Sequence, residues 1–155
     1  MVIDCIREAY ESYYSNVHRG AHHLSQRATD AYEEARVIIA RFMNAPSESN
    51  IVITSSVTES INLVAATWGR KFLKEGDEVI VSEMEHHANI VPWQMLREEK
   101  GIIIKVVPVR DDGSFHLQDF EACLSSRTKL VAITEVSNVL AAGGSSVVAG
   151  VDGGD

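Results

Sequence analysis

Residues 51–68 read IVITSSVTESINLVAATW, in which a short apolar run is followed by polar residues and then by a helical pattern. This order predicts a strand that leads directly into a helix over 57–74. Ser56 and Glu59 have the spacing of a capping box, in which Ser56 caps the helix and Glu59 reaches back to it. The free N–H groups of the first turn and the hydroxyl of Thr58 would then form a phosphate site, although plain helix capping also explains these residues.

Strands and helices alternate along the rest of the chain. We predict strands over 51–54, 78–82, 102–109 and 129–134, and further helices over 91–100 and 116–124. Helices of this length between strands are typical of crossover connections between parallel strands. The pattern therefore predicts an α/β fold with a mostly parallel sheet that is covered by helices on both faces.

The segment before residue 51 is helical in pattern. Apolar residues over 3–13 have helical spacing, so the chain opens inside a helix, and we expect that preceding structure is missing. The polar stretch NVHRGAHH, residues 16–23, leads to a second helix that Ser25 is expected to cap. Asn44 and Pro46 should end that helix.

Composition limits the class of protein. The 155 residues are 45% hydrophobic and 23% charged, which is typical of a soluble globular domain with one core. Fourteen Lys and Arg against 22 Asp and Glu give a net charge of -8, which argues against nucleic acid and anionic membranes as partners. No stretch is apolar enough to span a bilayer.

The cysteines and the first residues indicate a reducing compartment. Acidic residues throughout residues 2–14 argue against a secretory signal. Cys5 and Cys123 are isolated thiols without metal-binding spacing. We interpret both as ordinary buried or half-buried residues and not as nucleophiles.

A second polar cluster follows the next predicted strand, in SEMEHHANIVPW (82–93). His86 and His87 are flanked there by Glu85 and Asn89, at the same edge of the sheet as the phosphate site. A metal site is disfavoured, because neighbouring side chains point in different directions. An imidazole that lies over an aromatic cofactor, or that transfers a proton near neutral pH, explains such a residue better, while His87 could be a plain surface residue.

A third polar group ends the last predicted strand, in TEVSNVL (134–140). Asn138 could donate a hydrogen bond to a ligand that lies across the strand ends, although Ser137 and Asn138 also fit a simple turn. Three polar strand exits at one edge together predict a site for a phosphorylated ligand. Residues 141–155 are rich in Gly, Ser and Ala without a helical period, so we expect an aberrant or disordered tail there.

Four segments are recognisable as a set: NVHRG, TESINLVA, MEHHANIVPWQ and VSNVL. They occur in this order and at similar spacing in the SUF-type cysteine desulfurases and selenocysteine lyases, which are class V aminotransferase-like proteins. The chain resembles this group over residues 1–140. The resemblance implies that these residues are part of the large domain of a fold-type I transferase that depends on pyridoxal 5'-phosphate.

The resemblance also implies an activity. Members of the group are homodimers that remove sulfur from L-cysteine, or act on L-selenocysteine, and leave L-alanine. The sulfur becomes an enzyme-bound persulfide, which a sulfur-acceptor protein takes up for iron–sulfur cluster assembly. Such enzymes are expected in the cytoplasm, or in the plastid stroma of eukaryotes.

The matching motifs imply roles for single residues. Thr58 and the backbone at Val57 would hold the cofactor phosphate. His86, the implied catalytic residue, would stack on the pyridine ring and assist proton transfer. Asn138 would donate a hydrogen bond to the phenolic oxygen of the ring. No residue is implied as a metal ligand.

Four more residues are implied in supporting positions. Glu59 and Asn62 would support the phosphate loop, while His18 and Arg19 would lie near the substrate mouth, close to the dimer partner. One departure from the family pattern lies in the phosphate turn, where Ser56 stands in place of the usual glycine. This difference would alter phosphate binding without abolishing it.

Later family motifs have no counterpart in the chain. These motifs supply the Asp that pairs with the pyridine nitrogen, the Lys that forms the Schiff base and the Cys that takes the sulfur. Too few residues precede Asp152 for it to match that Asp. We therefore expect a truncated desulfurase that is inactive alone. Two alternatives stay open: a non-catalytic fragment that pairs with a full-length desulfurase or a scaffold protein, and another class V aminotransferase-like enzyme.

Overall fold

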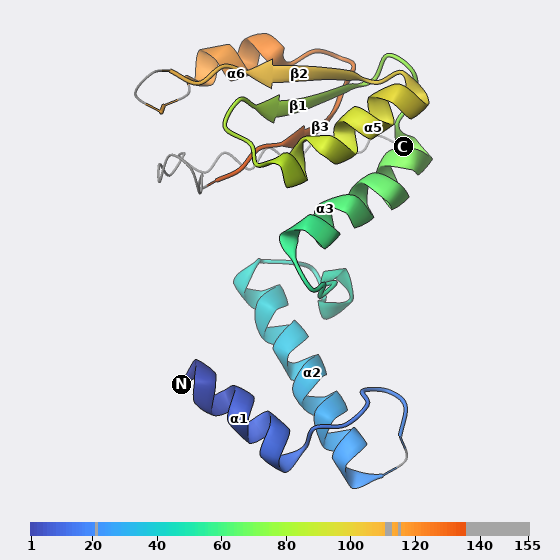
Figure 1. Cartoon of the computed structure of the whole chain (residues 1–155), viewed down its shortest axis with the longest axis vertical. Coiled ribbons are helices and arrows are strands. Elements are labelled where there is room, and N and C mark those ends of the chain that lie inside the picture. The colour runs from blue at the N-terminus through green and yellow to red at the C-terminus, as the bar shows by residue number, and fades with distance from the viewer. Residues whose placement is uncertain (21, 111–112, 115, 136–155) are drawn as a thin grey trace. The chain divides into compact units, whose positions relative to one another are not determined.

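The computed structural model describes residues 1–20, 22–110, 113–114 and 116–135. The chain divides into two compact units, Met1–Ile53 and Thr54–Asp155. The first unit is helical, and the second contains a sheet with helices (Figure 1). Asn138 and the tail expected over 141–155 lie outside the described residues, and a single partial domain over 1–140 stays a prediction.

The described residues of the first unit form two long helices and one short helix. These are α1 (Val2–Ser12), α2 (His23–Phe42) and the 3-10 helix η1 (Glu48–Asn50). The helix expected over 3–13 is confirmed, and α2 ends beside the predicted stop at Asn44. No residue of α1 is buried, and α2 buries only Ser25, Ala28 and Ala40.

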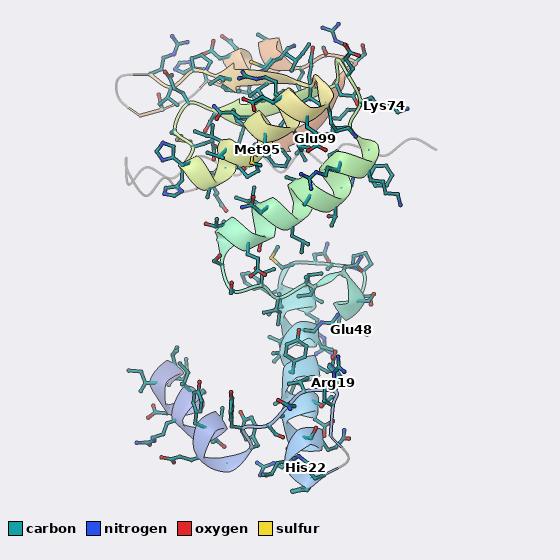
Figure 2. The ribbon with its side chains drawn as sticks, turned by 45° about the vertical axis from the view of Figure 1, so that its right-hand side comes forward. Arg19, His22, Glu48, Lys74, Met95 and Glu99 are labelled. Carbon is teal, nitrogen blue, oxygen red and sulfur yellow. The ribbon has the colours of Figure 1, made fainter. Side chains whose placement is uncertain are left out.

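His22, and not Ser25, caps α2. The Nδ1 atom of His22 accepts a hydrogen bond from the backbone N–H of Ser25 at 3.4 Å, and Figure 2 shows His22 at the first turn. Ser25 is 1% exposed, and its hydroxyl donates to the carbonyl of Asn16 at 2.7 Å. The predicted Ser25 cap is therefore wrong, because this hydroxyl fastens the preceding loop to the helix instead.

The described part of the second unit is built on a three-stranded parallel sheet in the order β2-β1-β3. Its strands are β1 (Glu78–Ser82), β2 (Ile103–Val107) and β3 (Thr128–Ala132). A helical body precedes β1 and comprises α3 (Val57–Val64), the π-helical turn η2 (Ala65–Gly69) and α4 (Arg70–Phe72). The remaining helices are the 3-10 turn η3 (His87–Asn89), α5 (Val91–Lys100) and α6 (Leu117–Cys123).

The central strand β1 carries a core on each face. Val79 and Val81 pack on one side with residues of η2 and α5, including the 2% exposed Trp93. Ile80 packs on the other side with Phe120 of α6. Successive residues of a strand face opposite sides, so a strand that is buried along its whole length, as β1 is, needs cover on both. The predicted α/β fold, with a parallel sheet between helices, is confirmed.

The strand expected over 51–54 is wrong. Ile51 has extended backbone angles, but no described strand pairs with this segment, and the first unit ends at Ile53. The carbonyl of Ile51 instead accepts a hydrogen bond from Nε of Arg36 at 3.2 Å. A strand needs a neighbouring backbone to satisfy its polar groups, and an apolar pattern alone does not supply that neighbour.

Candidate functional site

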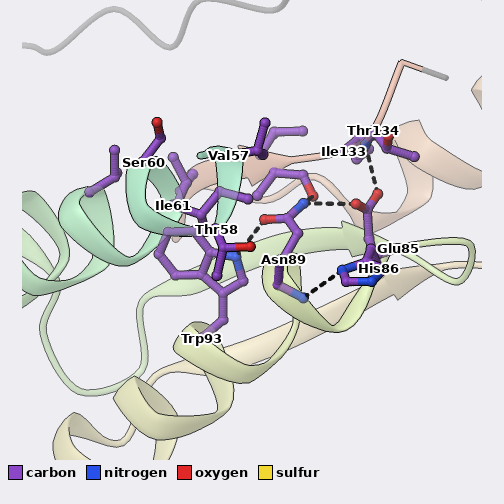
Figure 3. Close-up of a pocket in the computed structure, with 15 residues that line it drawn as sticks. Val57, Thr58, Ser60, Ile61, Glu85, His86, Asn89, Trp93, Ile133 and Thr134 are labelled. Atoms are coloured by element: carbon purple, nitrogen blue, oxygen red, sulfur yellow. Dashed lines mark hydrogen bonds between the residues drawn. The ribbon is translucent and has the colours of Figure 1, made fainter. Parts of the chain in front are cut away.

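A pocket of about 650 Å³ lies in the second unit, where β1 and β3 end. Figure 3 shows the parts of the chain that line it: α3, the turn that follows β1, Trp93 of α5, and the last part of β3 with the residues after it. The volume is in the range of small-molecule sites. Parallel strands bring their carboxyl ends to one edge, which is why segments far apart in sequence meet here.

The start of α3 follows the predicted cap only in part. The hydroxyl of Ser56 accepts from the backbone N–H of Glu59 at 3.2 Å, as the sequence predicts. The carboxylate of Glu59, however, does not bond Ser56. It accepts from the backbone N–H of Ser55 at 2.7 Å and from its hydroxyl at 2.5 Å. The reciprocal half of the capping box is therefore displaced by one residue.

This displaced bond fixes the charge of Glu59. The hydrogen bonds from the side chain and then the backbone of Ser55 hold the pKa of Glu59 below its ordinary value of 4.5. The ionised carboxylate ties the segment before α3 to the helix. A second tie joins the hydroxyls of Thr54 and Ser60 at 2.6 Å. The path of the chain into α3 is thus held by side chains.

The first turn of α3 is open toward the pocket. Val57 and Thr58 line the pocket, and Val57 is 73% exposed. Among the described residues, the backbone N–H groups of Val57 and Thr58 meet no acceptor, as is usual for a helix start. Two donors and the positive end of the helix dipole therefore face the pocket and could hold an anion.

Asn62 forms a hydrogen bond with this turn. Its Nδ2 donates to the carbonyl of Thr58 at 2.8 Å, one helical turn away. Asn62 lines a separate small cavity of about 50 Å³ beside α5 and not the main pocket. Asn62 therefore contacts Thr58 but does not itself line the main pocket.

His86 lines the pocket at the start of η3. Its side chain is exposed, and its Nδ1 accepts from the backbone N–H of Ala88 at 3.1 Å. Since Nδ1 accepts, a neutral His86 ring carries its proton on Nε2. His87 is also exposed but does not line the pocket, which fits the surface interpretation of that residue.

A network that the sequence did not predict lies behind His86. Glu85 accepts from Nδ2 of Asn89 at 2.8 Å and from the backbone N–H of Thr134 at 2.7 Å. Asn89 in turn accepts from Nε1 of Trp93 at 3.0 Å (Figure 3). The only sequence signal was that Glu85 and Asn89 flank the histidine pair. The bond from Thr134 to Glu85 joins residues that are 49 positions apart in the sequence.

The first unit contains the two expected substrate-mouth residues. His18 has a left-handed φ of 57°, and its Nε2 lies 3.0 Å from a carboxylate oxygen of Glu33. Its backbone N–H donates to the hydroxyl of Thr29 at 3.1 Å, so the loop is tied to α2. Arg19, labelled in Figure 2, is exposed beside it. The place of both residues near a substrate stays a prediction, because the pocket belongs to the second unit.

The described residues contain neither a cluster of metal ligands nor a membrane-spanning helix. No three or more His, Cys, Asp or Glu side chains gather there in a way that could hold a metal ion. Over the same residues, no helix combines the length and the apolar character needed to cross a bilayer. Asn138 lies beyond Glu135, the last described residue.

The fold and this site place the chain in a known class of protein. It belongs to the aminotransferase class-V family, whose profile matches residues 1–145. The chain is 53% identical over 140 residues to a probable cysteine desulfurase of Mycolicibacterium paratuberculosis. The match covers 90% of this chain and 20% of that protein. It is 51% identical over 139 residues to a cysteine desulfurase of Dickeya dadantii. This match covers 90% of this chain and 34% of that protein.

Solved structures agree with the sequence matches. The apo structure of cysteine desulfurase from Thermococcus onnurineus is 40% identical, with a TM-score of 0.83, and the match covers 92% of this chain and 35% of that one. The resemblance to cysteine desulfurases is therefore confirmed. The chain spans only 20% to 34% of the length of the two relatives compared by sequence.

Proposed function

We propose that the pocket is part of the pyridoxal 5'-phosphate site of a cysteine desulfurase, which releases sulfur from L-cysteine for iron–sulfur cluster assembly. One observation carries this proposal: the open first turn of α3 and the ring of His86 line the same pocket. The free N–H groups of a helix start bind phosphate, and an imidazole ring can stack on a flat heteroaromatic ring. Relatives that are named cysteine desulfurases support the choice of reaction.

The described residues fit this cofactor. The N–H groups of Val57 and Thr58 and the hydroxyl of Thr58 would hold its phosphate, while Ile61 and Ile133 supply apolar wall. When bound, the cofactor supplies an aromatic ring that withdraws electrons from the substrate carbon. His86 would cover that ring and, with its proton on Nε2, exchange a proton with the substrate. Asn138 is proposed as the donor to the phenolic oxygen.

We infer that this 155-residue chain binds the cofactor non-covalently and does not turn over cysteine alone. No lysine is among the described residues that line the pocket, so no described side chain there can form a Schiff base. Glu59 and Asn62 are proposed as supports of the phosphate turn, and His18 and Arg19 as residues near the substrate. We place the protein in the cytoplasm; two free cysteines are consistent with a reducing compartment.

The test of the phosphate site is calorimetric titration of pyridoxal 5'-phosphate into the chain and its Thr58→Val variant. This change removes the hydroxyl and keeps the shape, so we expect Kd to rise about tenfold or more, because a hydrogen bond to a charged group contributes about 1.5–3 kcal/mol. Thr67→Val is the matched control: Thr67 is exposed, bonds Leu63 and lies outside the pocket.

The ring side of the pocket is tested in the same titration with His86→Ala. We expect Kd to rise about two- to tenfold, as an aromatic contact contributes about 0.5–1.5 kcal/mol. The neighbouring His87→Ala should leave Kd unchanged, because His87 does not line the pocket. The proposed cofactor site is wrong if the unmodified chain shows no saturable binding. It is also wrong if Thr67→Val and His87→Ala weaken binding as much as Thr58→Val and His86→Ala do.

A second candidate role is pairing with another desulfurase chain. The observation that favours it is α1, whose apolar residues Val2, Ile3 and Ile6 are 70%, 80% and 54% exposed. Apolar side chains exposed in a row are typical of contact surfaces. Sedimentation of the chain alone and with a full-length desulfurase would show whether either complex forms.

A further inference from the structure

We propose that Glu85 is the positioning residue of this site: its carboxylate fastens the turn that holds His86 to the end of β3, and so sets where the imidazole stands in the pocket. This inference rests on the proposed function only in taking His86 to face a bound cofactor. The contacts themselves belong to the free chain.

Three donors converge on the Glu85 carboxylate. Its Oε1 accepts from the hydroxyl of Ser82 at 2.5 Å and from the backbone N–H of Thr134 at 2.7 Å, while its Oε2 accepts from Nδ2 of Asn89 at 2.8 Å. Ser82 is the last residue of β1, and Thr134 follows β3. One side chain thus joins the ends of two neighbouring strands.

Asn89 completes the fastening. Its Nδ2 also donates to the carbonyl of Ala132 at 3.0 Å, and its Oδ1 accepts from Nε1 of the buried Trp93 at 3.0 Å. Both amide donors and the amide oxygen are therefore engaged. Glu85 and Asn89 each reach the backbone of the β3 end, at Thr134 and Ala132, so the turn is held at two points.

His86 lies inside this closed turn. The bond between Glu85 and Asn89 spans it, the backbone N–H of Asn89 donates to the carbonyl of His86 at 2.8 Å, and the ring accepts from Ala88. The side chain of His86 is exposed, so packing does not fix it. Its place in the pocket depends on the turn, and the turn depends on Glu85.

The first test uses the free chain and nuclear magnetic resonance. Glu85→Gln keeps the shape but leaves an NH₂ group facing either Asn89 or Thr134, and Glu85→Ala removes all three bonds. We expect hydrogen exchange at the Thr134 amide to quicken about tenfold or more in Glu85→Ala. The ring nitrogens of His86, expected as the Nε2–H form, should shift toward a mixture of tautomers in both variants.

Glu83→Gln is the matched control. Glu83 is an exposed carboxylate two residues earlier that also accepts from a distant backbone N–H, that of Val109 at 3.0 Å, and it does not line the pocket. We expect no change at His86 in this variant. A purely structural role for Glu85 would lower the melting temperature while the His86 signals of the folded variants stayed as they are, and that result would overturn the proposal.

The second test adds pyridoxal 5'-phosphate. Glu85→Gln should raise Kd by no more than the two- to tenfold expected for His86→Ala, because the His86 ring is misplaced but still present, while Glu83→Gln should leave Kd unchanged. If neither the unmodified chain nor any variant binds the cofactor, the proposed function fails. The His86 and Thr134 signals of the free chain still decide the role of Glu85. Unchanged signals in Glu85→Gln reject the role even if Glu85→Ala does not fold.

Discussion

Glu78 is the only buried charged side chain among the described residues, with an exposed fraction of 0%. It lies at the start of β1, at the opposite end of the strand from the pocket. Ser125 donates to its carboxylate at 2.6 Å, Lys105 lies at 2.9 Å and Arg127 at 3.0 Å. A buried carboxylate persists only with such partners, because burial alone disfavours its charge.

These partners predict an acid-dependent loss of stability. The hydrogen bonds from Ser125, then from Lys105 and Arg127, lower the pKa of Glu78 from 4.5 to about 2. Well above pH 4.5 the carboxylate is ionised in both states, and its contribution to stability is complete. As the pH falls from 4.5 toward about 2, the unfolded chain binds the proton first, so that contribution is lost.

The measurement is urea unfolding of the chain and of Glu78→Gln at several pH values. We expect Glu78→Gln to be less stable near neutral pH, and the gap to narrow as the pH falls through this window. Glu99→Gln is the control, since Glu99 is half exposed and pairs with Arg70 at 3.0 Å on the surface. A gap that stays constant with pH would contradict the role given to Glu78.

At the level of elements, the contact between η2 and α5 is close. An added Cβ at Gly69 would lie 2.7 Å from Cδ1 of Leu96, which is 3% exposed. Alanine usually stabilises a helix by about 1 kcal/mol relative to glycine. Here overpacking against Leu96 costs about 1–3 kcal/mol, because the buried leucine has little room to move.

We therefore predict that Gly69→Ala lowers the free energy of unfolding, opposite to its effect in an open helix. Thermal unfolding of Gly69→Ala, Leu96→Ala and the double variant measures this. The double variant should lose less stability than the two single variants lose together, because removing the leucine side chain makes room for the new methyl group. Strict additivity would show that the contact is not the cause.

For the whole molecule, the two units differ in how much apolar surface they bury. The second unit has a core on each face of its sheet, whereas the first unit buries Ser25, Ala28 and Ala40 and leaves the apolar residues of α1 exposed. Burial of apolar area is the main favourable term in folding and association. The first unit therefore gains more from a partner chain.

We predict that α1 mediates association. In sedimentation experiments, Ile6→Asp should weaken any complex about tenfold or more, since burying one isoleucine contributes about 1.5–3 kcal/mol. Arg7→Asp introduces the same residue one position along the helix, where the native side chain is already charged, and serves as the control. Equal effects of the two changes would indicate a general charge effect and not an apolar contact.

Much of the fold was predictable from local patterns. The bounds of β1 and α5 agree with the predicted 78–82 and 91–100, because strand period, Pro92 near the helix start and Gly101 at its left-handed end are all local signals. The helix start at Val57 and the place of His86 at a strand exit were also predictable. The alternation of strands and helices predicts parallel strands, whereas the strand order β2-β1-β3 came from the structure.

The amino-acid sequence by itself determined the α/β class, most element bounds and the edge of the sheet at which the pocket lies, because periodicity and capping act between near neighbours. Only the tertiary structure decided that residues 51–54 pair with no described strand and that His22 caps α2. It alone joined Glu85 to Thr134 across 49 residues. Such bonds depend on which backbones meet in space, and no local pattern encodes that meeting.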